Sequence, residues 1–172
     1  MSQKNNSRKS YAIFRTNREN KGTATQWELS YKQTQNKKGE NVDNWFMFLE
    51  GATQKGVDEN GNARYDWEKK ITVKLGENDI GEILSVLNGI KDSAGYKGSM
   101  YHQTPGGGNK SITFAINQQE GKDYNPTQGY KLRIAAQDAS KNLTQVQQLI
   151  SPAEAEILKA LLQRALVRMF GW

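Results

Sequence analysis

The sequence predicts an α+β protein made of two β-rich units, each closed by a helix. The first observation is an internal repeat: Glu-Ile-Leu at residues 82–84 recurs at residues 156–158, an offset of 74 residues, within similar segments at 76–84 and 150–158. The second observation is that a basic, strand-like stretch leads into an amphipathic helix once in each half. Because the order of elements is the same in both halves, we expect two similar units within one domain.

The first unit is expected to contain strands at the residue ranges 9–16, 23–33, 45–49 and 63–75. The second of these alternates as a half-buried strand does, with Trp27 on one side and Glu28 on the other. The third is apolar on both faces, so it should be covered by the core and also by a subunit interface or by bound bases. A hairpin signal at Asn60 and Gly61 precedes the fourth, and the polar segment 34–44 is predicted to be a loop.

Each unit is predicted to end in an amphipathic helix. The first spans about residues 78–90, where apolar residues recur at helical spacing. The second runs to about residue 170 and has a sharp start signal: Ser151 is the N-cap, Pro152 the first helical residue, and Glu154 completes a capping box. Its apolar face is too wide for a lone surface helix, so part of it is expected to contact another subunit.

The second unit is expected to contain strands at 99–103, 111–117, 130–136 and 143–149. Polar and glycine-rich segments separate them, at 104–109, 120–129 and 138–142. For the chain as a whole we expect a flexible N-terminus at residues 1–8 and a single domain at 9–172, made of pseudo-repeats at about 9–91 and 98–172.

The composition limits what such a fold can do. Hydrophobic residues make up 35% of the 172 residues, a low fraction for a self-sufficient globule. A thin protomer of this kind is expected to complete its burial by associating with copies of itself. The 24 Lys and Arg against 18 Asp and Glu give a net charge of +6, which favours a polyanionic partner, although many proteins carry such a charge for solubility alone.

Several functional classes are disfavoured by what the sequence lacks. It has no cysteine and a single histidine, His102, so thiolate and His-pair metal sites are ruled out and no metal is expected. The glycine-rich segment 106–111 lacks the first glycine of a phosphate-binding loop, so no cofactor or small-molecule substrate is expected. Apolar runs fall short of the roughly 20 residues that cross a bilayer, and no secretion signal is present, so we expect a cytoplasmic protein without a membrane partner.

Aromatic residues interleaved with basic ones on predicted strands are typical of single-stranded nucleic-acid binding. Bases of any identity stack on aromatic rings, while Lys and Arg contact the phosphates. Tyr11, Trp45 and Tyr101 have basic residues near them in sequence, and for these three both base stacking and core packing remain open. For Trp27 and Trp67, core packing is the favoured interpretation.

Short motifs resemble those of a known family. Tyr-Asp-Trp at 65–67, followed by a strand and by Ile-Gly at 80–81, is similar to the Tyr-Asp-Trp strand and the Thr-Glu-Ile-Gly helix start of the Whirly single-stranded DNA-binding proteins of plant organelles. Lys-Gly-Thr-Ala-Thr at 21–25 is similar to their Lys-Gly-Lys-Ala-Ala-Leu motif. The Gly-Trp at 171–172 follows an apolar helix, as it does after their conserved domain. From about 21–172 the chain thus resembles the Whirly family.

The resemblance implies two four-stranded antiparallel β-sheets packed crosswise, each followed by a helix, so that the order ββββα occurs twice. It also implies homotetramers assembled through the two helices, which bind single-stranded DNA along sheet edges between protomers with little sequence preference. Such binding would protect single-stranded DNA in replication, recombination or repair. Thr23 stands where the family has a lysine linked to higher assembly of tetramers, so assembly beyond the tetramer is left open. Without a transit-like extension, the chain would be bacterial, from a phage-infected cell, or an organelle-matrix protein whose transit peptide was removed.

Together these arguments predict a homotetramer that coats single-stranded DNA without a catalytic step. The residues expected to contact phosphates are Lys9, Arg15, Lys21, Lys69 and Lys110. The residues expected to stack on bases are Tyr11, Trp45 and Tyr101, and those expected to donate hydrogen bonds are Thr23 and Thr25.

Two alternatives remain open. The first is an RNA-binding or RNA-annealing protein of the same fold, because stacking and phosphate contacts do not by themselves choose the sugar. The second is a small enzyme acting on nucleic acid, with His102 or acidic residues as catalysts. A surface or base-stacking role suits this histidine better than catalysis.

Overall fold

The computed structural model describes residues 10–118 and 128–172. The predicted flexible N-terminus, Lys9 and most of the predicted loop at 120–129 lie outside the described residues. In chain order the elements are β1 (Ser10–Arg15), β2 (Thr23–Gln35), β3 (Asn41–Val57), β4 (Ala63–Tyr65), the 3-10 helix η1 (Trp67–Lys69), β5 (Ile71–Leu75), α1 (Glu77–Leu87), β6 (Met100–Gln103), β7 (Asn109–Ile116), β8 (Tyr130–Gln137), β9 (Leu143–Ile150) and α2 (Pro152–Met169).

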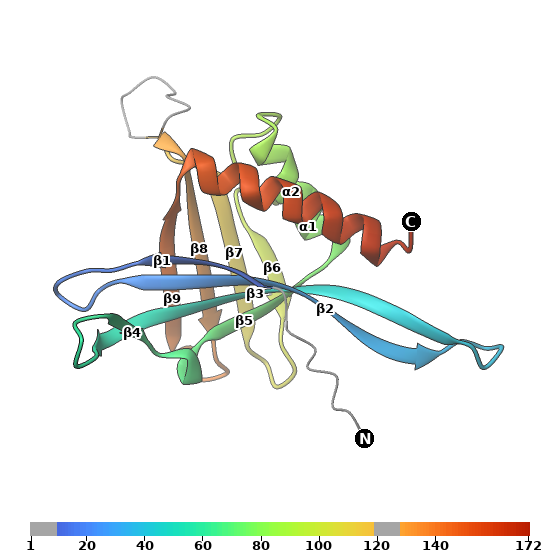
Figure 1. The fold of residues 1–172 in the computed structure, drawn as a ribbon, viewed down its shortest axis with the longest axis horizontal. Helices are drawn as coiled ribbons and strands as arrows, with labels where there is room; N and C mark the ends of the chain where they lie inside the picture. The colour runs from blue at the N-terminus through green and yellow to red at the C-terminus, as the bar shows by residue number, and fades with distance from the viewer. Residues whose placement is uncertain (1–9, 119–127) are drawn as a thin grey trace.

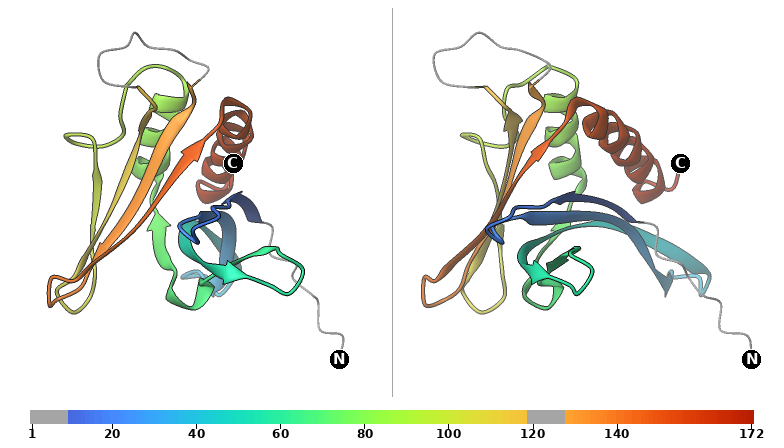
Figure 2. Two further views of the ribbon diagram at one scale, coloured as in Figure 1. Left: turned by 90° about the vertical axis from the view of Figure 1, so that its left-hand side faces the viewer. Right: turned by 60° about the vertical axis from the view of Figure 1, so that its left-hand side comes forward.

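Two antiparallel sheets, each followed by a helix, make up the fold, which confirms the predicted class (Figure 1). In the first sheet the order is β1-β2-β3. Both β4 and β5 pair with the free edge of β3, each along a different part of it, so together they occupy the fourth position of the sheet. In the second sheet the order is β6-β7-β8-β9. The strands of the first sheet run across those of the second, and the two helices lie in the angle between the sheets (Figures 1 and 2).

The predicted loop at residues 34–44 is wrong, because this segment forms the end of a long hairpin. β2 and β3 remain paired out to Gln35 and Asn41. Polar cross-strand contacts accompany the backbone bonds, among them Gln33 Nε2 to Asp43 Oδ1 at 3.3 Å. A polar sequence suggests a loop, but a hairpin exposed on both sides needs no apolar face when polar cross-strand pairs support it. Figure 1 shows this hairpin projecting well beyond the sheets.

The single strand predicted for residues 63–75 is wrong in its middle, where η1 separates β4 from β5. β5 pairs with β3 from Met47 to Gly51, whereas β4 pairs farther along β3, beside a register shift between Gln54 and Gly56. Such a bulge bends and twists the strand that contains it. One straight partner strand cannot pair with both parts of β3. The partner strand is therefore interrupted by η1, with β4 paired to one part of β3 and β5 to the other.

The helix α1 ends at Leu87, short of the predicted residue 90, because Gly89 reverses the chain. The N–H of Gly89 donates to Val86 O at 3.0 Å, and the N–H of Ile90 donates to Ser85 O at 2.9 Å. This pair of bonds is the Schellman motif, which needs a residue with positive φ, and Gly89 has φ +70°.

The predicted start of α2 is confirmed as a capping box. The hydroxyl oxygen of Ser151 accepts a hydrogen bond from the N–H of Glu154 at 3.3 Å, and the Glu154 carboxylate accepts one from the N–H of Ser151 at 2.8 Å. Two of the backbone donors that every helix start leaves free are satisfied in this way.

The start of α1 reveals the true register of the internal repeat. The Asp79 carboxylate accepts a hydrogen bond from the N–H of Gly76 at 2.8 Å, so Gly76 is the counterpart of Ser151, 75 residues later. The Glu-Ile-Leu repeat has an offset of 74 and is therefore one residue out of structural register. For this reason Ile83 is buried, whereas its sequence counterpart Ile157 is 46% exposed.

The core lies where the inner faces of the two sheets meet each other and the helices. One cluster of buried residues includes Trp27 of the first sheet, Phe114 of the second, Ile83 of α1 and Leu158 of α2. The core interpretation of Trp27 is confirmed, since its side chain is fully buried.

The sheets approach one another closely at Gly51 of β3. A Cβ atom at this position would lie 3.0 Å from Ile134 Cδ1 and 3.1 Å from Val146 Cβ, both in the second sheet. Contacts between real Cβ atoms and their neighbours are rarely so short. The absence of a side chain at this position therefore allows the close approach.

Replacing Gly51 with Val is expected to lower the free energy of unfolding by about 1–3 kcal/mol, because the branched side chain overpacks the crossing. Gly81→Ala is the matched control, because a Cβ there would meet nothing within 4 Å. In the middle of a helix this change should raise the free energy of unfolding by about 0.5–1 kcal/mol. Urea unfolding followed by circular dichroism measures both, and a Gly51→Val protein as stable as the wild type would show that the crossing is loosely packed.

Candidate nucleic-acid interface

The exposed side of the second sheet, here called the outer face, is basic. Strands β6 to β9, all of whose residues the structure describes, contain Lys110, Lys131 and Arg133 but no Asp or Glu. Side chains alternate along each strand, so that Phe114 and Leu132 are buried toward the core and their neighbours point the other way. The outer face carries Tyr101, Ser111, Thr113, Lys131, Arg133, Gln145, Gln147 and Leu149.

Strand pairing arranges the outer face in rows. One row contains Thr113, Arg133 and Gln147, and the next runs from Tyr101 to Gln145. Arg133 Nε donates to Gln145 Oε1 at 3.0 Å and so joins the two rows. The Tyr101 side chain is 73% exposed, which leaves its ring accessible to a ligand. A shallow groove of about 320 Å³ lies on this face, and its lining includes Thr113, Lys131, Arg133, Gln147 and Leu149.

The turn between β1 and β2 adjoins the outer face at the β9 edge. Thr23 Oγ1 donates to the backbone oxygen of Gln147 at 2.9 Å. The buried Gln54 fixes the turn, since its Oε1 accepts a hydrogen bond from the N–H of Asn17 at 2.9 Å. Lys21 lies in this turn, and its ion pair with a glutamate of the same turn is solvent-exposed and therefore weak. The structure thus brings Lys21 and Thr23 to the edge of the face that carries Tyr101.

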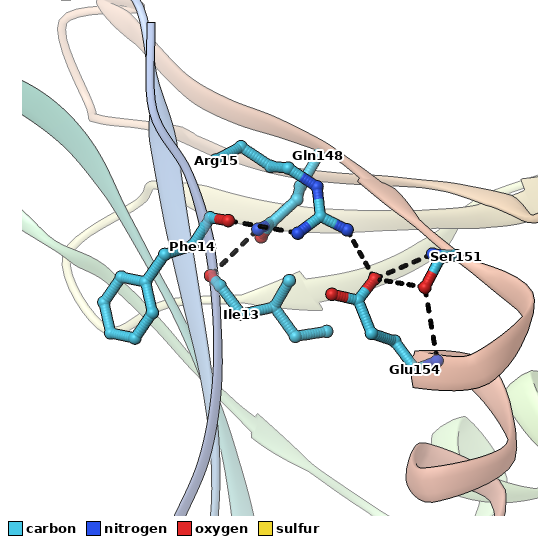
Figure 3. A network of polar contacts seen from close by, with 6 residues as sticks. All are labelled: Ile13, Phe14, Arg15, Gln148, Ser151 and Glu154. Atoms are coloured by element: carbon cyan, nitrogen blue, oxygen red, sulfur yellow. Dashed lines mark hydrogen bonds and ion pairs between the residues drawn. The ribbon is translucent and has the colours of Figure 1, made fainter.

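Arg15 is used inside the protomer. Its guanidinium forms an ion pair with Glu154 at the start of α2 and donates a hydrogen bond to Phe14 O at 3.0 Å (Figure 3). Beside it, Gln148 Nε2 donates to Ile13 O at 2.9 Å. These contacts fasten β1 to α2 and to the second sheet. To contact a phosphate, Arg15 would have to give up its ion pair.

Each helix start has an Arg or His side chain from the other unit beside it. Glu154 of α2 is paired with Arg15 of β1, and Asp79 of α1 has an oxygen 3.4 Å from Nε2 of His102 in β6. Burial alone would raise the pKa of Glu154, but hydrogen bonds from Arg15 and Ser151 outweigh it and hold that pKa below its usual value. His102 accordingly lies against a helix cap and points away from the outer face.

Within residues 10–118 and 128–172, no group of three His, Asp or Glu side chains is arranged to hold a metal ion. The helices of these ranges are all too short or too polar to cross a membrane.

Three further predicted contact residues lie on the core side of the first sheet. Thr25 is fully buried, so the prediction that its hydroxyl donates a hydrogen bond to DNA does not fit its position. Tyr11 packs against the core, and burial raises the pKa of its hydroxyl. The Trp45 ring lies 4.8 Å from the Tyr31 ring and 5.5 Å from the Arg168 guanidinium, so both neighbours would compete with a base for it.

The remaining predicted lysines are separated in space. Lys110 Nζ donates to Thr72 O of the first sheet at 2.6 Å, so it bridges the sheets. Lys69 is 86% exposed, with its Nζ 4.0 Å from Asp66. Lys9 lies outside the described residues.

Sequence reasoning missed Lys131 and Arg133. A signal for them was present, because the predicted strands of the second unit contain basic but no acidic residues. Recognising it requires knowing which face of that sheet is covered, and a strand pattern alone does not tell which side meets the other sheet.

The ion pair at the start of α2 makes stability dependent on pH. A carboxylate whose pKa is lowered by folding stabilises the protein above its ordinary pKa of 4.5, and this contribution is lost as the pH falls through the lower folded value. Glu154→Gln is therefore expected to cost about 1 kcal/mol at pH 7 and to flatten the loss of stability below pH 4.5.

Urea unfolding between pH 3 and pH 7 checks this expectation, with Glu156→Gln on the exposed side of α2 as the control. The control should retain the slope of the wild type. An unchanged slope in Glu154→Gln would mean that this carboxylate has no special partner in solution.

No protein-family model matches the sequence, and no curated protein matches it. Solved structures do match the fold. WHY1 from Arabidopsis thaliana aligns over 96% of this chain and 86% of its own with 19% identity and a TM-score of 0.72. The plant transcriptional regulator PBF-2 aligns over 96% and 84% with 19% identity and a TM-score of 0.69, and WHY3 from Arabidopsis thaliana over 95% and 89% with 18% identity and a TM-score of 0.69. The chain therefore has the Whirly fold.

Proposed function

We propose that the protein binds single-stranded DNA with little sequence preference, through the outer face and the adjoining β1–β2 turn. The observation that carries this proposal is a sheet face with two cations, an exposed tyrosine and no acidic residue on its strands. An acidic side chain on such a face would repel phosphates, and its absence over four strands favours a polyanion. The Whirly fold supports the same proposal.

The chemistry of the outer face suits a single strand better than a duplex. Tyr101 offers an exposed ring, and stacking on such a ring contributes about 1–3 kcal/mol per base for any base. Lys131, Arg133 and Lys21 supply the charges for phosphates. Gln145 and Gln147 add neutral hydrogen-bonding groups between these charges. Binding of this kind needs no catalytic step, and we propose none.

The proposal includes the cellular process and the compartment in which the protein acts. Coating of single strands would protect them in replication, recombination or repair, in the cytoplasm. Nucleic acid as the partner agrees with PBF-2 being a transcriptional regulator.

We further propose that the chain forms a homotetramer through its helices. Ile157 and Leu161 are 46% and 38% exposed and lie one turn apart on α2, where they form an apolar stripe. Such a stripe on a protomer of low hydrophobic content is best buried against another copy.

Arg133→Gln is expected to weaken binding to single-stranded DNA at all sequences and to reduce the salt dependence of the affinity by about one phosphate contact. Fluorescence anisotropy with a labelled oligonucleotide of about 30 nucleotides over a salt series measures both. Lys38→Gln removes the same charge from the exposed turn between β2 and β3 and is the control, with affinity close to that of the wild type.

The RNA counterpart and the duplex complete this experiment. Tight, salt-sensitive binding to single-stranded DNA alone supports the proposal, and equal affinity for the RNA favours the RNA-binding alternative. Binding to none of the three nucleic acids would overturn the proposed function.

Leu161→Asp should dissociate the tetramer and weaken DNA binding at the same time, because it places a charge in the apolar stripe of α2. Size-exclusion chromatography with light scattering, followed by anisotropy, measures both effects. Val57→Asp, at an exposed apolar position on β3, is the control and should leave the assembly intact. A monomeric variant with unchanged DNA affinity would contradict the coupling between assembly and binding.

A further inference from the structure

An aromatic pocket lies on the first sheet, away from the outer face. It has a volume of about 510 Å³ and is lined by Phe14, Thr16, Asn62, Ala63, Tyr65 and Trp67, together with Gly61. This volume lies within the range of about 300–1,000 Å³ that is usual for small-molecule sites. We infer that this aromatic pocket receives one unpaired nucleobase of the bound strand, an inference that rests on the proposed function.

The three rings of the pocket come from separate segments: Phe14 from β1, Tyr65 from β4 and Trp67 from η1. The rings of Phe14 and Tyr65 lie 5.4 Å apart at an angle of 47°. Phe14 is 51% exposed, and the hydroxyl of Tyr65 is buried. Phe14 therefore presents an accessible ring surface, while the Tyr65 ring packs against it.

Packing in the core does not explain these rings. Figure 3 shows the ring of Phe14 pointing away from Arg15 and Glu154, on the opposite side of β1. The large core cluster contains neither Phe14 nor Trp67, and Trp67 is only partly buried. The sequence favours core packing for Trp67, but the structure places this residue outside the core cluster. A partly exposed phenylalanine and tryptophan around a pocket are suited to stacking with a flat ligand.

The lysines near the pocket suit a flat ligand that carries a phosphate, as a nucleotide does. Lys55 and Lys69 lie 3.8 and 4.0 Å from the carboxylate of Asp66, which follows Tyr65 in the chain. Lys55 and Lys69 thus place two cations beside the rings, next to the carboxylates of Asp66 and Glu68. Lys69 is 86% exposed, so it is free to contact the phosphate of a nucleotide whose base lies against Trp67.

The β1–β2 turn connects the pocket to the outer face. Thr16 lines the pocket, and residues 17–22 lead from it to Thr23, which is bonded to β9. Arg18 and Lys21 are exposed along this turn. A single strand that crosses the turn would meet these cations between its contacts on the outer face and the base in the pocket.

The test compares a thymidine oligonucleotide with an abasic oligonucleotide of equal length, using fluorescence anisotropy. Phe14→Ala is expected to weaken binding of the thymidine strand about fivefold or more, because one stacked base is lost. Its affinity for the abasic strand should stay unchanged, since the phosphate contacts remain. Tyr96→Ala removes an exposed ring outside the pocket, one that is 79% exposed against 51% for Phe14, and should change neither affinity.

Photo-cross-linking provides a second test of base binding in the pocket, and it uses the wild-type protein. A strand with 5-iododeoxyuridine in place of thymidine, irradiated on the wild-type protein, should form adducts on Phe14, Tyr65 or Trp67 that mass spectrometry locates. DNA binding without such adducts, and with Phe14→Ala unchanged, would overturn the pocket while leaving the proposed function in place. A wild-type protein that binds no single strand would overturn both.

Discussion

The rest of the structure depends on the close crossing of the two sheets at Gly51. Ile134 and Val146 of the second sheet come so near to β3 that a side chain at this position would be crowded. Each sheet can bury its apolar side only against the other sheet and the helices, so the crossing decides which face of every strand is covered. The opposite face of the second sheet is left to solvent, and the residues of the proposed interface lie there.

Folding uses part of the positive charge that the sequence supplies. Arg15 is paired with Glu154, and Lys110 donates to a backbone oxygen of the first sheet. Both help to hold the sheets and α2 together, and both are poorly placed to contact a ligand. Among the described residues, Lys131 and Arg133 form no ion pair with Asp or Glu, so both charges remain on the outer face.

Alternation along the strands separates side chains that are adjacent in sequence. Phe14 lines the aromatic pocket, while Arg15 points to the start of α2 on the other side of β1 (Figure 3). In β3, Trp45 contacts Arg168 of α2, whereas Phe46 contacts Phe48 and lies beneath Lys74. An aromatic and a basic residue that are adjacent in sequence therefore lie on opposite faces of the sheet. Which of the two faces solvent depends on which side of the sheet is covered.

The sequence by itself determined the order of strands and helices, the capping box at Ser151 and the burial of Trp27, because these depend on residues within a few positions of one another or on a clear alternation. The tertiary structure decided where β3 bends and where its partner strand is interrupted. It also decided which cations are not used in contacts within the protomer and which aromatic rings are exposed. Arg15 and Glu154 are 139 residues apart, and no local pattern encodes a contact over that distance. Such contacts form only when the sheets cross, so the candidate site could be placed only after the fold was known.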